Sequence, residues 1–131
     1  MEKTKISSYK DLDVYQRAYK ACLIVMQQVV PKLPPEEKYD MKSQLSRSSK
    51  AVPRLIGEGY AKKHQKKGFQ KYLDDAMSES NETEVGMMQC KDLYFTQIDP
   101  SLSQTLANEY NIIGRQIFKL REAWSKFTDT R

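Results

Sequence analysis

Lysines gather in one short segment of the chain, between residues 60 and 71. Ammonium groups that neutralise several phosphates displace the counterions of a nucleic acid and so bind it. The segment therefore predicts a phosphate-binding surface for RNA or DNA. A solvated corner between two helices is the alternative, because runs of charge usually face water. The segment holds no acidic residue and a single histidine, His64, among its five lysines: Lys62, Lys63, Lys66, Lys67 and Lys71.

A second group of cations lies upstream of these lysines. Arg47, Lys50 and Arg54 recur at intervals of three and four residues, which places them on one face of a helix. They could extend a strip of phosphate contacts. They could equally pair with carboxylates of the next helix, where five acids form a compensating face: Asp74, Asp75, Glu79, Glu82 and Glu84.

Three aromatic residues lie close to the lysines in the chain. Tyr60, Phe69 and Tyr72 could stack on unpaired bases, as aromatic side chains do in many proteins that bind single strands. Two of the three also fit the packing pattern of a helix. Both interpretations stay open at this stage.

Patterns that carry catalysis or bind metals are lacking in the sequence. It has no Gly-x-Ser-x-Gly, no P-loop and no dinucleotide-binding fingerprint, and Cys22 and Cys90 fall among apolar repeats rather than in a Cys/His cluster. Di-metal bundles use Glu-x-x-His repeats on facing helices, so Glu58 and Glu82 are expected to cap backbone groups or pair with arginines instead. We expect no enzymatic activity, no metal and no cofactor.

Four apolar stripes predict the helices that position these groups. Their residues alternate at intervals of three and four. We expect helices at about 10–32, 36–57, 67–98 and 100–127, packed as an all-α, antiparallel, up-down four-helix bundle in one domain of residues 1–131. The stripes are Leu12, Tyr15, Tyr19, Cys22, Met26, Val29 and Leu33; Met41, Leu45, Ser48, Val52 and Leu55; Phe69, Leu73, Ala76, Ser80, Thr83, Met87, Cys90 and Tyr94; and Leu106, Tyr110, Ile113, Ile117, Leu120, Trp124 and Phe127.

Prolines mark helix starts and one irregularity. Pro34 and Pro35 suit the start of the second helix, and Asp99 is a candidate N-cap with Pro100 as the first residue of the fourth. Pro53 falls inside the second pattern, where it removes an amide donor. We therefore expect a kink or a loosened turn at this point.

Additional apolar residues widen the stripes of the first and last helices. They exceed what the core of a lone four-helix bundle needs, and so they predict a homo-oligomer. A wide core with scattered exposed apolar residues is the alternative, and the sequence does not decide between them. These residues are Val14, Ala18, Ala21, Val25, Leu102 and Ile112.

The overall charge is basic but moderate. The chain has 131 residues, with 22 Lys and Arg against 17 Asp and Glu, and a net charge of +5. This balance permits RNA, DNA or an acidic protein as a partner and demands none of them. No apolar run has the length of a signal peptide or a membrane span, so we expect a cytoplasmic protein with buried free thiols and no membrane contact.

Three stretches resemble one known family. They read YKDLDVYQRAY at 9–19, QLSRSSKAVPRLIGEG at 44–59 and FQKYLDDAMSESNETE at 69–84. Together they are similar to the four-helix-bundle proteins encoded within intervening sequences of bacterial large-subunit (23S) ribosomal RNA genes, a group related to accessory proteins of diversity-generating retroelements. The matching positions are Leu12, Val14, Gln16 and Ala18; Gln44, Leu45 and Arg47; Val52, Pro53, Ile56, Glu58 and Gly59; and Phe69, Leu73, Ala76, Glu82 and Glu84.

The chain departs from the family pattern at several positions. Leu55 stands where the family tends to have Asn, Gly57 where it has Ala, and Ser78 and Glu79 where it commonly has Gly and Ser. Any role of that Asn is therefore not carried over. The resemblance implies an up-down bundle that assembles into a ring, in related proteins a pentameric barrel, with a nucleic-acid or ribonucleoprotein partner.

These observations predict a non-enzymatic, basic, oligomeric bundle that binds structured RNA or a nucleoprotein. The alternative is an oligomeric scaffold for protein–protein interaction without nucleic-acid binding. Under the first hypothesis, phosphate contacts come from Lys62, Lys63, Lys66, Lys67 and Lys71, extended by Arg47, Lys50 and Arg54.

Overall fold

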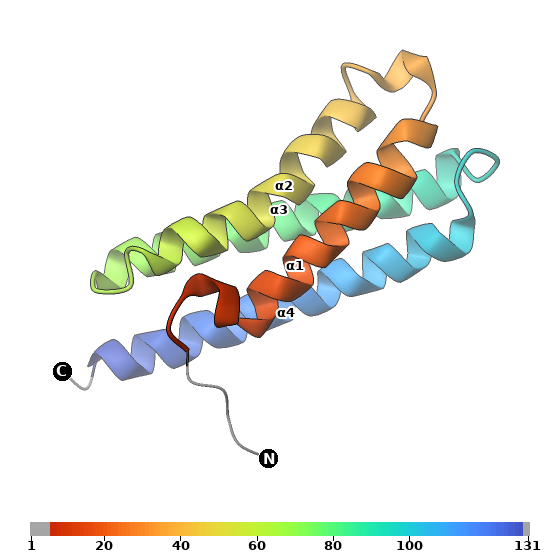
Figure 1. Cartoon of the computed structure of the whole chain (residues 1–131). Helices are drawn as coiled ribbons and strands as arrows, with labels where there is room; N and C mark the ends of the chain where they lie inside the picture. The colour runs from red at the N-terminus through yellow and green to blue at the C-terminus, as the bar shows by residue number, and fades with distance from the viewer. Residues whose placement is uncertain (1–5, 130–131) are drawn as a thin grey trace.

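Four α-helices make up the computed structural model, which describes residues 6–129 and their side chains except those of residues 66 and 126–129 (Figure 1). They are α1 (Asp13–Ile24), α2 (Met41–Tyr60), α3 (Lys66–Leu93) and α4 (Pro100–Asp129). No strand occurs within residues 6–129, so the all-α prediction is confirmed. In this part of the chain, no helix combines the length and the apolar character that a membrane crossing requires.

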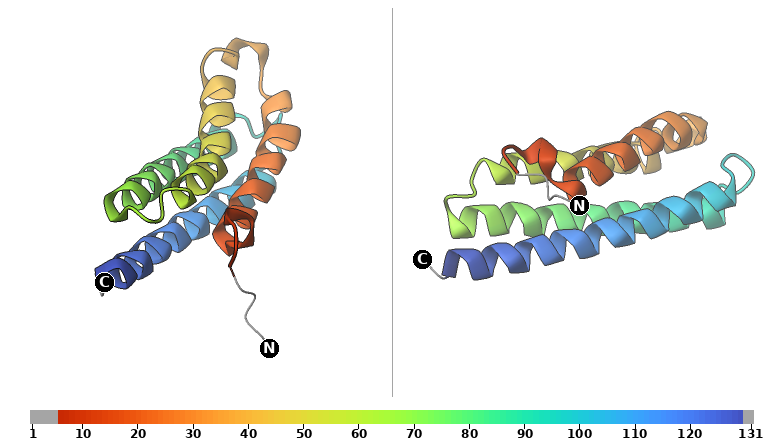
Figure 2. Two further views of the ribbon diagram at one scale, coloured as in Figure 1. Left: turned by 60° about the vertical axis from the view of Figure 1, so that its left-hand side comes forward. Right: turned by 60° about the horizontal axis from the view of Figure 1, so that its bottom comes forward.

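The helices surround a common core. α1 packs against α2 and α4, and α3 packs against the same two helices (Figure 2). The connection between α2 and α3 lies at the same end of the molecule as the C-terminal part of α4 (Figure 1), whereas the connection between α3 and α4 lies at the other end. The end of α4 can therefore contact the lysine-rich segment.

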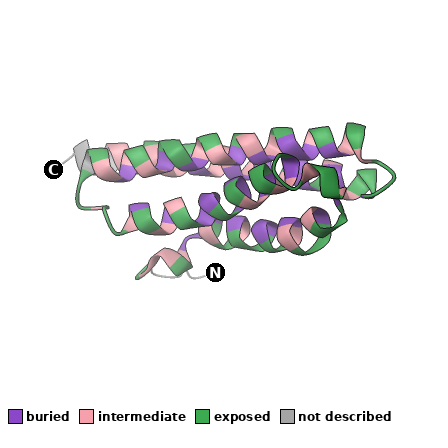
Figure 3. Cartoon of the chain, turned by 90° about the horizontal axis from the view of Figure 1, so that it is seen from above, coloured by how far each residue is buried: buried purple, intermediate pink, exposed green. Residues whose placement is uncertain are grey.

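Buried residues recur along the helices and are coloured purple in Figure 3. The stripes predicted for the second, third and fourth helices supply most of this core. Phe127, the last residue of the fourth stripe, has a side chain outside the described part of the chain. The buried members of these stripes include Leu45, Val52, Phe69, Leu73, Ala76, Met87, Cys90, Tyr110, Ile113 and Ile117.

The stripe predicted for the first helix is only partly correct. The core face of α1 carries Val14, Ala18 and Ala21, and Val25 follows in the next turn. All four are buried, whereas Tyr19 of the predicted seam is 49% exposed. Small alanines let α1 approach both α2 and α4, while a tyrosine keeps its hydroxyl in water at the edge of the core. For these four residues, a wide core is therefore the correct interpretation.

The first helix is also shorter than predicted. After α1 the chain continues as a π-helical turn (Val25–Val29) and a 3₁₀ turn (Val30–Lys32). Pro31 explains the change, because it has no N–H to continue the α-helical ladder. Immediately before it, the N–H of Val30 reaches five residues back to the carbonyl oxygen of Val25.

α2 begins at Met41 rather than at residue 36, because Pro35–Glu37 forms a separate 3₁₀ turn. It also continues to Tyr60, three residues beyond the predicted end at residue 57, since no glycine adopts a positive φ that would stop it. Pro53 lies inside the continuous helix, and the axis of α2 bends near its middle (Figure 1), as predicted.

α3 ends at Leu93 rather than at the predicted residue 98. The connection to α4 needs these residues, and within it Ile98 folds back onto the core with 1% exposure. α4 starts as predicted, with Pro100 as its first residue. The side-chain Oδ1 of Asp99 accepts a 2.9 Å hydrogen bond from the N–H of Ser101.

Candidate nucleic-acid interface

The lysine-rich segment forms a tight corner between α2 and α3. The N–H of Lys62 donates to the carbonyl of Gly59 at 2.8 Å, and the N–H of Gln65 donates to the carbonyl of Lys62 at 2.9 Å. These short-range bonds reverse the chain within residues 61–65. Lysines on both sides of the reversal therefore come to one end of the molecule. We call Lys62, Lys63, Lys66, Lys67 and Lys71 the lysine corner.

Two lysines of the corner are available for new partners. Lys62 and Lys67 are exposed and form no ion pair with any residue that the structure describes. Lys71 lies 3.5 Å from the carboxylate of Asp75, one turn along α3, and both side chains are largely exposed. Such a surface pair is weak and can exchange for a phosphate. The side chain of Lys66 is outside the described part.

Lys63 turns back over the protein surface. Its Nζ donates a 2.9 Å hydrogen bond to the hydroxyl of Tyr60 and lies 4.2 Å from the centroid of the same ring. This cation–π contact leaves the positive charge at the corner. It also means that Lys63 covers the aromatic ring beside it.

A chain of aromatic rings lies beneath the corner. Tyr60 and Phe69 meet edge to face with centroids 6.4 Å apart, and Phe69 meets Trp124 in the same way at 5.0 Å. The indole Nε1 of Trp124 also donates a 3.1 Å hydrogen bond to the carbonyl of Lys63. Sequence analysis placed Trp124 in the core stripe and missed this bond. A half-buried indole N–H needs a hydrogen-bond acceptor, and this need is the only signal in the sequence that could have indicated the bond.

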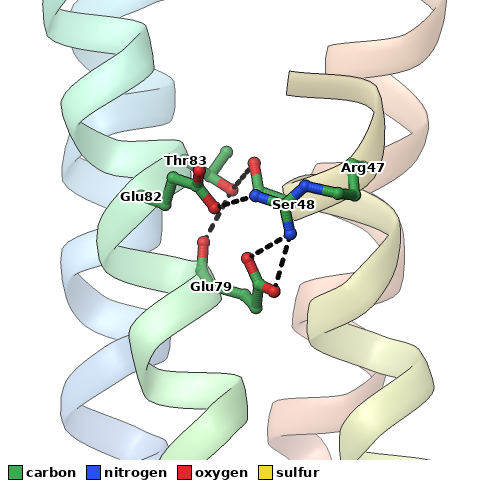
Figure 4. A network of polar contacts seen from close by, with 5 residues as sticks. All are labelled: Arg47, Ser48, Glu79, Glu82 and Thr83. Carbon is green, nitrogen blue, oxygen red and sulfur yellow. Dashed lines mark hydrogen bonds and ion pairs between the residues drawn. The ribbon is translucent and has the colours of Figure 1, made fainter. Parts of the chain in front are cut away.

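Arg47 lies in a different place, on the groove between α2 and α3 (Figure 4). Its guanidinium donates to both carboxylate oxygens of Glu79, at 3.0 and 2.9 Å, and also pairs with Glu82. Pairing with the acids of the third helix is therefore the correct interpretation for Arg47. Glu82 was expected either to cap backbone groups or to pair with an arginine, and it pairs with Arg47.

The three charged groups alter each other's titration. Burial is the main reason that the pKa of Glu79 is raised, and the hydrogen bond with Glu82 raises it further against the effect of Arg47. Burial also acts to raise the pKa of Glu82, but its hydrogen bonds with Glu79 and Arg47 outweigh burial and lower it. The hydrogen bonds to Glu82 and Glu79 raise the pKa of Arg47. This guanidinium is thus charged and already occupied.

A buried polar contact lies beside this network (Figure 4). The hydroxyls of Ser48 in α2 and Thr83 in α3 are 2.8 Å apart and hydrogen-bonded, and both residues are fully buried. The hydroxyl of Thr83 also lies 2.9 Å from the carbonyl oxygen of Glu79. The pair fixes α2 against α3 and has a structural role.

Lys50 and Arg54 border a third region, the groove between α1 and α2. Arg54 lies 3.8 Å from Glu58, one turn along the helix, and both side chains are exposed. Glu58 therefore lies close to an arginine, as expected. The three cations predicted to form one strip are divided, because Arg47 faces α3 whereas Lys50 and Arg54 face α1. The groove has a volume of about 370 Å³ and is lined by Tyr15, Tyr19, Cys22, Leu23, Met26, Lys50, Pro53 and Arg54.

Metal-ligating side chains do not converge in the part of the chain that the structure describes. Within it, no group of three or more His, Cys, Asp or Glu side chains is placed to hold a metal ion. His64, the one histidine of the sequence, is exposed in the lysine-rich connection.

Comparison with known proteins places the chain in a family. Residues 10–119 match the family model described as 23S rRNA-intervening sequence protein. Neither a curated protein nor a solved structure matches the chain. The matched range includes α1, α2, α3, the lysine corner and most of α4. The resemblance carried by three stretches of the sequence is therefore confirmed, and the chain belongs to the 23S rRNA-intervening sequence protein family.

Proposed function

We propose that the chain is a non-enzymatic protein that binds structured RNA, alone or in a nucleoprotein, through the lysine corner. The observation that carries this proposal is the exposure of Lys62 and Lys67 without an ion-pair partner among the described residues. A lysine without a carboxylate partner can bind a phosphate without first breaking an ion pair within the protein. Lys63 and Lys71 add positive charge to this surface, although Lys63 contacts the ring of Tyr60 and Lys71 pairs with Asp75.

Arg47, Lys50 and Arg54 belong less directly to this surface. Arg47 would have to leave Glu79 and Glu82 before it could meet a phosphate. Lys50 and Arg54 border the groove between α1 and α2, next to the half of α2 that leads into the corner. We assign the primary contacts to the lysine corner and a secondary, long-range attraction to Lys50 and Arg54.

The proposed compartment is the cytoplasm. Cys22 and Cys90 are both buried free thiols. Burial raises the pKa of the Cys90 thiol to about 11, so this thiol stays protonated and unreactive. Two unpaired cysteines suit a reducing compartment.

We also propose that the up-down bundle assembles into a ring, as the resemblance implies. Two apolar grooves support this assembly: one of about 370 Å³ between α1 and α2, and one of about 500 Å³ between α3 and α4, beside the 52%-exposed Phe118. Because α1 and α3 each pack between α2 and α4, these grooves lie on opposite sides of the bundle. A contact between unlike sides repeats around an axis and can close a ring, which multiplies the lysine corner.

Light scattering with size-exclusion chromatography tests the assembly. Tyr19→Glu introduces a charge on the groove between α1 and α2 and should reduce the mass of the assembly to that of smaller species. Tyr39→Glu, at a position that is 87% exposed and does not line this groove, is the matched control and should leave the mass unchanged. A wild-type chain that has the mass of a monomer contradicts the ring.

Charge reversal tests the binding surface. Lys62→Glu combined with Lys67→Glu should weaken binding to an RNA hairpin by more than about tenfold at low salt, because phosphate contacts dominate such affinities. The control is Lys32→Glu combined with Lys38→Glu, which makes the same change of charge at the other end of α2, about 30 Å away. This control should weaken binding to the hairpin far less. Retained affinity in a folded corner variant overturns the assignment.

A protein-interaction scaffold is the second candidate function. Large apolar side chains at the end of the bundle opposite the lysine corner favour it: Tyr39, Leu93 and Phe95 are 87%, 62% and 58% exposed. Such residues often serve as anchors in protein interfaces. A partner protein that copurifies after nuclease treatment, and is lost in Tyr39→Ala with Phe95→Ala, would support the scaffold over RNA binding.

A further inference from the structure

Of the aromatic residues beside the lysine corner, Phe69 is buried, and Tyr60 and Tyr72 are half-buried. Phe69 is fully buried between the rings of Tyr60 and Trp124, with centroid distances of 6.4 and 5.0 Å. A ring in this position cannot reach a base of a bound nucleic acid. One of the three candidate stacking residues from the sequence is therefore used entirely for packing.

The other two candidate rings are also restricted. The half-buried Tyr60 is covered by Lys63, whose Nζ lies 4.2 Å from the ring centroid and donates a hydrogen bond to the hydroxyl. Tyr72 is half-buried as well and packs at its base against α2, since a Cβ added to Gly59 would lie 2.6 Å from the Cβ of Tyr72. Stacking platforms for unpaired bases need open ring faces. The corner offers at most part of Tyr72.

The cations at the corner are also of one type. Residues 60–72 contain no arginine, and the guanidinium of Arg47 is held by Glu79 and Glu82 on another face. Lysine binds a phosphate as a point charge, whereas the fork of arginine is the commonest reader of base edges. The corner is therefore suited to the sugar–phosphate backbone.

We infer that the lysine corner binds the phosphate backbone of double-helical RNA, without regard to sequence, and binds single strands poorly; this rests on the RNA-binding function proposed above. Proteins that hold single strands usually combine positive charge with stacking, and this corner has the charge with at most part of one ring face. Two strands present a higher charge density than one, so each contact releases more counterions. Double-stranded RNA is recognised largely by its shape and phosphates.

A comparison of three RNA probes against the full-length chain tests this inference. The probes are a duplex of about 20 base pairs, long enough for one module, a duplex of the same length with scrambled sequence, and an oligouridine of equal length. The two duplexes should bind within about twofold of each other, and the oligouridine at least about tenfold more weakly at the same salt. The fall of log K with log salt should also be steeper for the duplex. Each phosphate contact contributes about 0.9 to this slope for a duplex and about 0.7 for a single strand.

Tyr72→Leu separates stacking from charge. It retains an apolar side chain in α3 and should leave the affinity for each probe unchanged within about twofold, because the ring is not a platform. Equal or tighter binding of the oligouridine, or an about tenfold loss of its binding in a folded Tyr72→Leu variant, overturns the inference while RNA binding stands. If the wild-type chain binds none of the three probes, the proposed function itself fails.

Discussion

The indole Nε1 of Trp124 donates a hydrogen bond of 3.1 Å to the carbonyl oxygen of Lys63, 61 residues earlier in the chain. This bond joins α4 to the connection between α2 and α3. The same indole packs edge to face on Phe69 at 5.0 Å. Lysines on a turn that is already fixed lose less conformational entropy on binding than lysines on a loose segment. The last helix thus helps to fix the turn that carries the lysine corner.

Trp124→Phe should loosen the corner while the ring contact with Phe69 remains. Loss of the hydrogen bond leaves the carbonyl of Lys63 without this donor and should lower the free energy of unfolding by about 1 kcal/mol. Urea unfolding followed by circular dichroism measures this change. Amide hydrogen exchange should accelerate at residues 61–65. Unchanged exchange there would show that the bond does not hold the corner.

Arg47→Leu should raise the pKa of both Glu79 and Glu82, because Arg47 lowers both in the wild-type chain. The folded pKa of Glu79 then lies still further above its ordinary value of 4.5. A folded state that binds this proton more tightly than the unfolded state is most stable at acidic pH. The stability of the variant should therefore fall as pH rises through the folded pKa of Glu79.

Carboxyl ¹³C chemical shifts and urea unfolding between acidic and neutral pH measure this effect. Arg54→Leu removes an exposed arginine outside the network and serves as the control, which should leave the titration of Glu79 and Glu82 unchanged. An Arg47→Leu variant with the wild-type titration of both carboxyls contradicts the interaction between these three groups.

Thr83→Val should destabilise the chain by about 1–3 kcal/mol, because it leaves the buried hydroxyl of Ser48 without its hydrogen-bond partner. Adding Ser48→Ala removes that hydroxyl and should restore part of the loss. A double-mutant cycle from urea unfolding gives the coupling energy, for which we expect about 1 kcal/mol. Additive effects of the two substitutions would mean that the hydroxyls do not stabilise each other.

Gly59→Ala should destabilise the contact of α2 with α3, since the new Cβ would lie 2.6 Å from the Cβ of Tyr72. Forcing the helices apart costs about 1–3 kcal/mol. In Gly114→Ala, the nearest atom is Ser80 Oγ at 3.8 Å, so this control should gain up to about 1 kcal/mol from helix propensity. Equal melting temperatures for the two variants would contradict the close approach.

The periodicity of apolar residues predicts most of this fold, because three of the four stripes follow one face of a regular helix. It is only partly correct for α1, where both Tyr19 and Ala18 fit a helical repeat. Which of them faces the core depends on the proximity of α2 and α4, a tertiary effect that no local pattern contains. The missed end of α3 has the same origin, since Ile98 leaves the predicted helix and covers the core.

The candidate site was predictable in part. The lysines of the corner stand next to each other in the sequence, so composition alone locates them. The role of Trp124 depends on a contact across 61 residues, and the separation of Arg47 from Lys50 and Arg54 depends on which helices flank α2. Spacing places residues on a helix face, but the neighbouring helices decide their partners.

The salt dependence of RNA binding tests the central claim most directly. Affinity for an RNA hairpin is measured between low and moderate salt for the wild-type chain and for Lys62→Glu combined with Lys67→Glu. If the lysine corner contacts phosphates, log K should fall steeply with log salt in the wild-type chain, and the slope should become shallower by about 2 in the variant. Absence of binding at low salt, or the same slope in both proteins, would contradict the account.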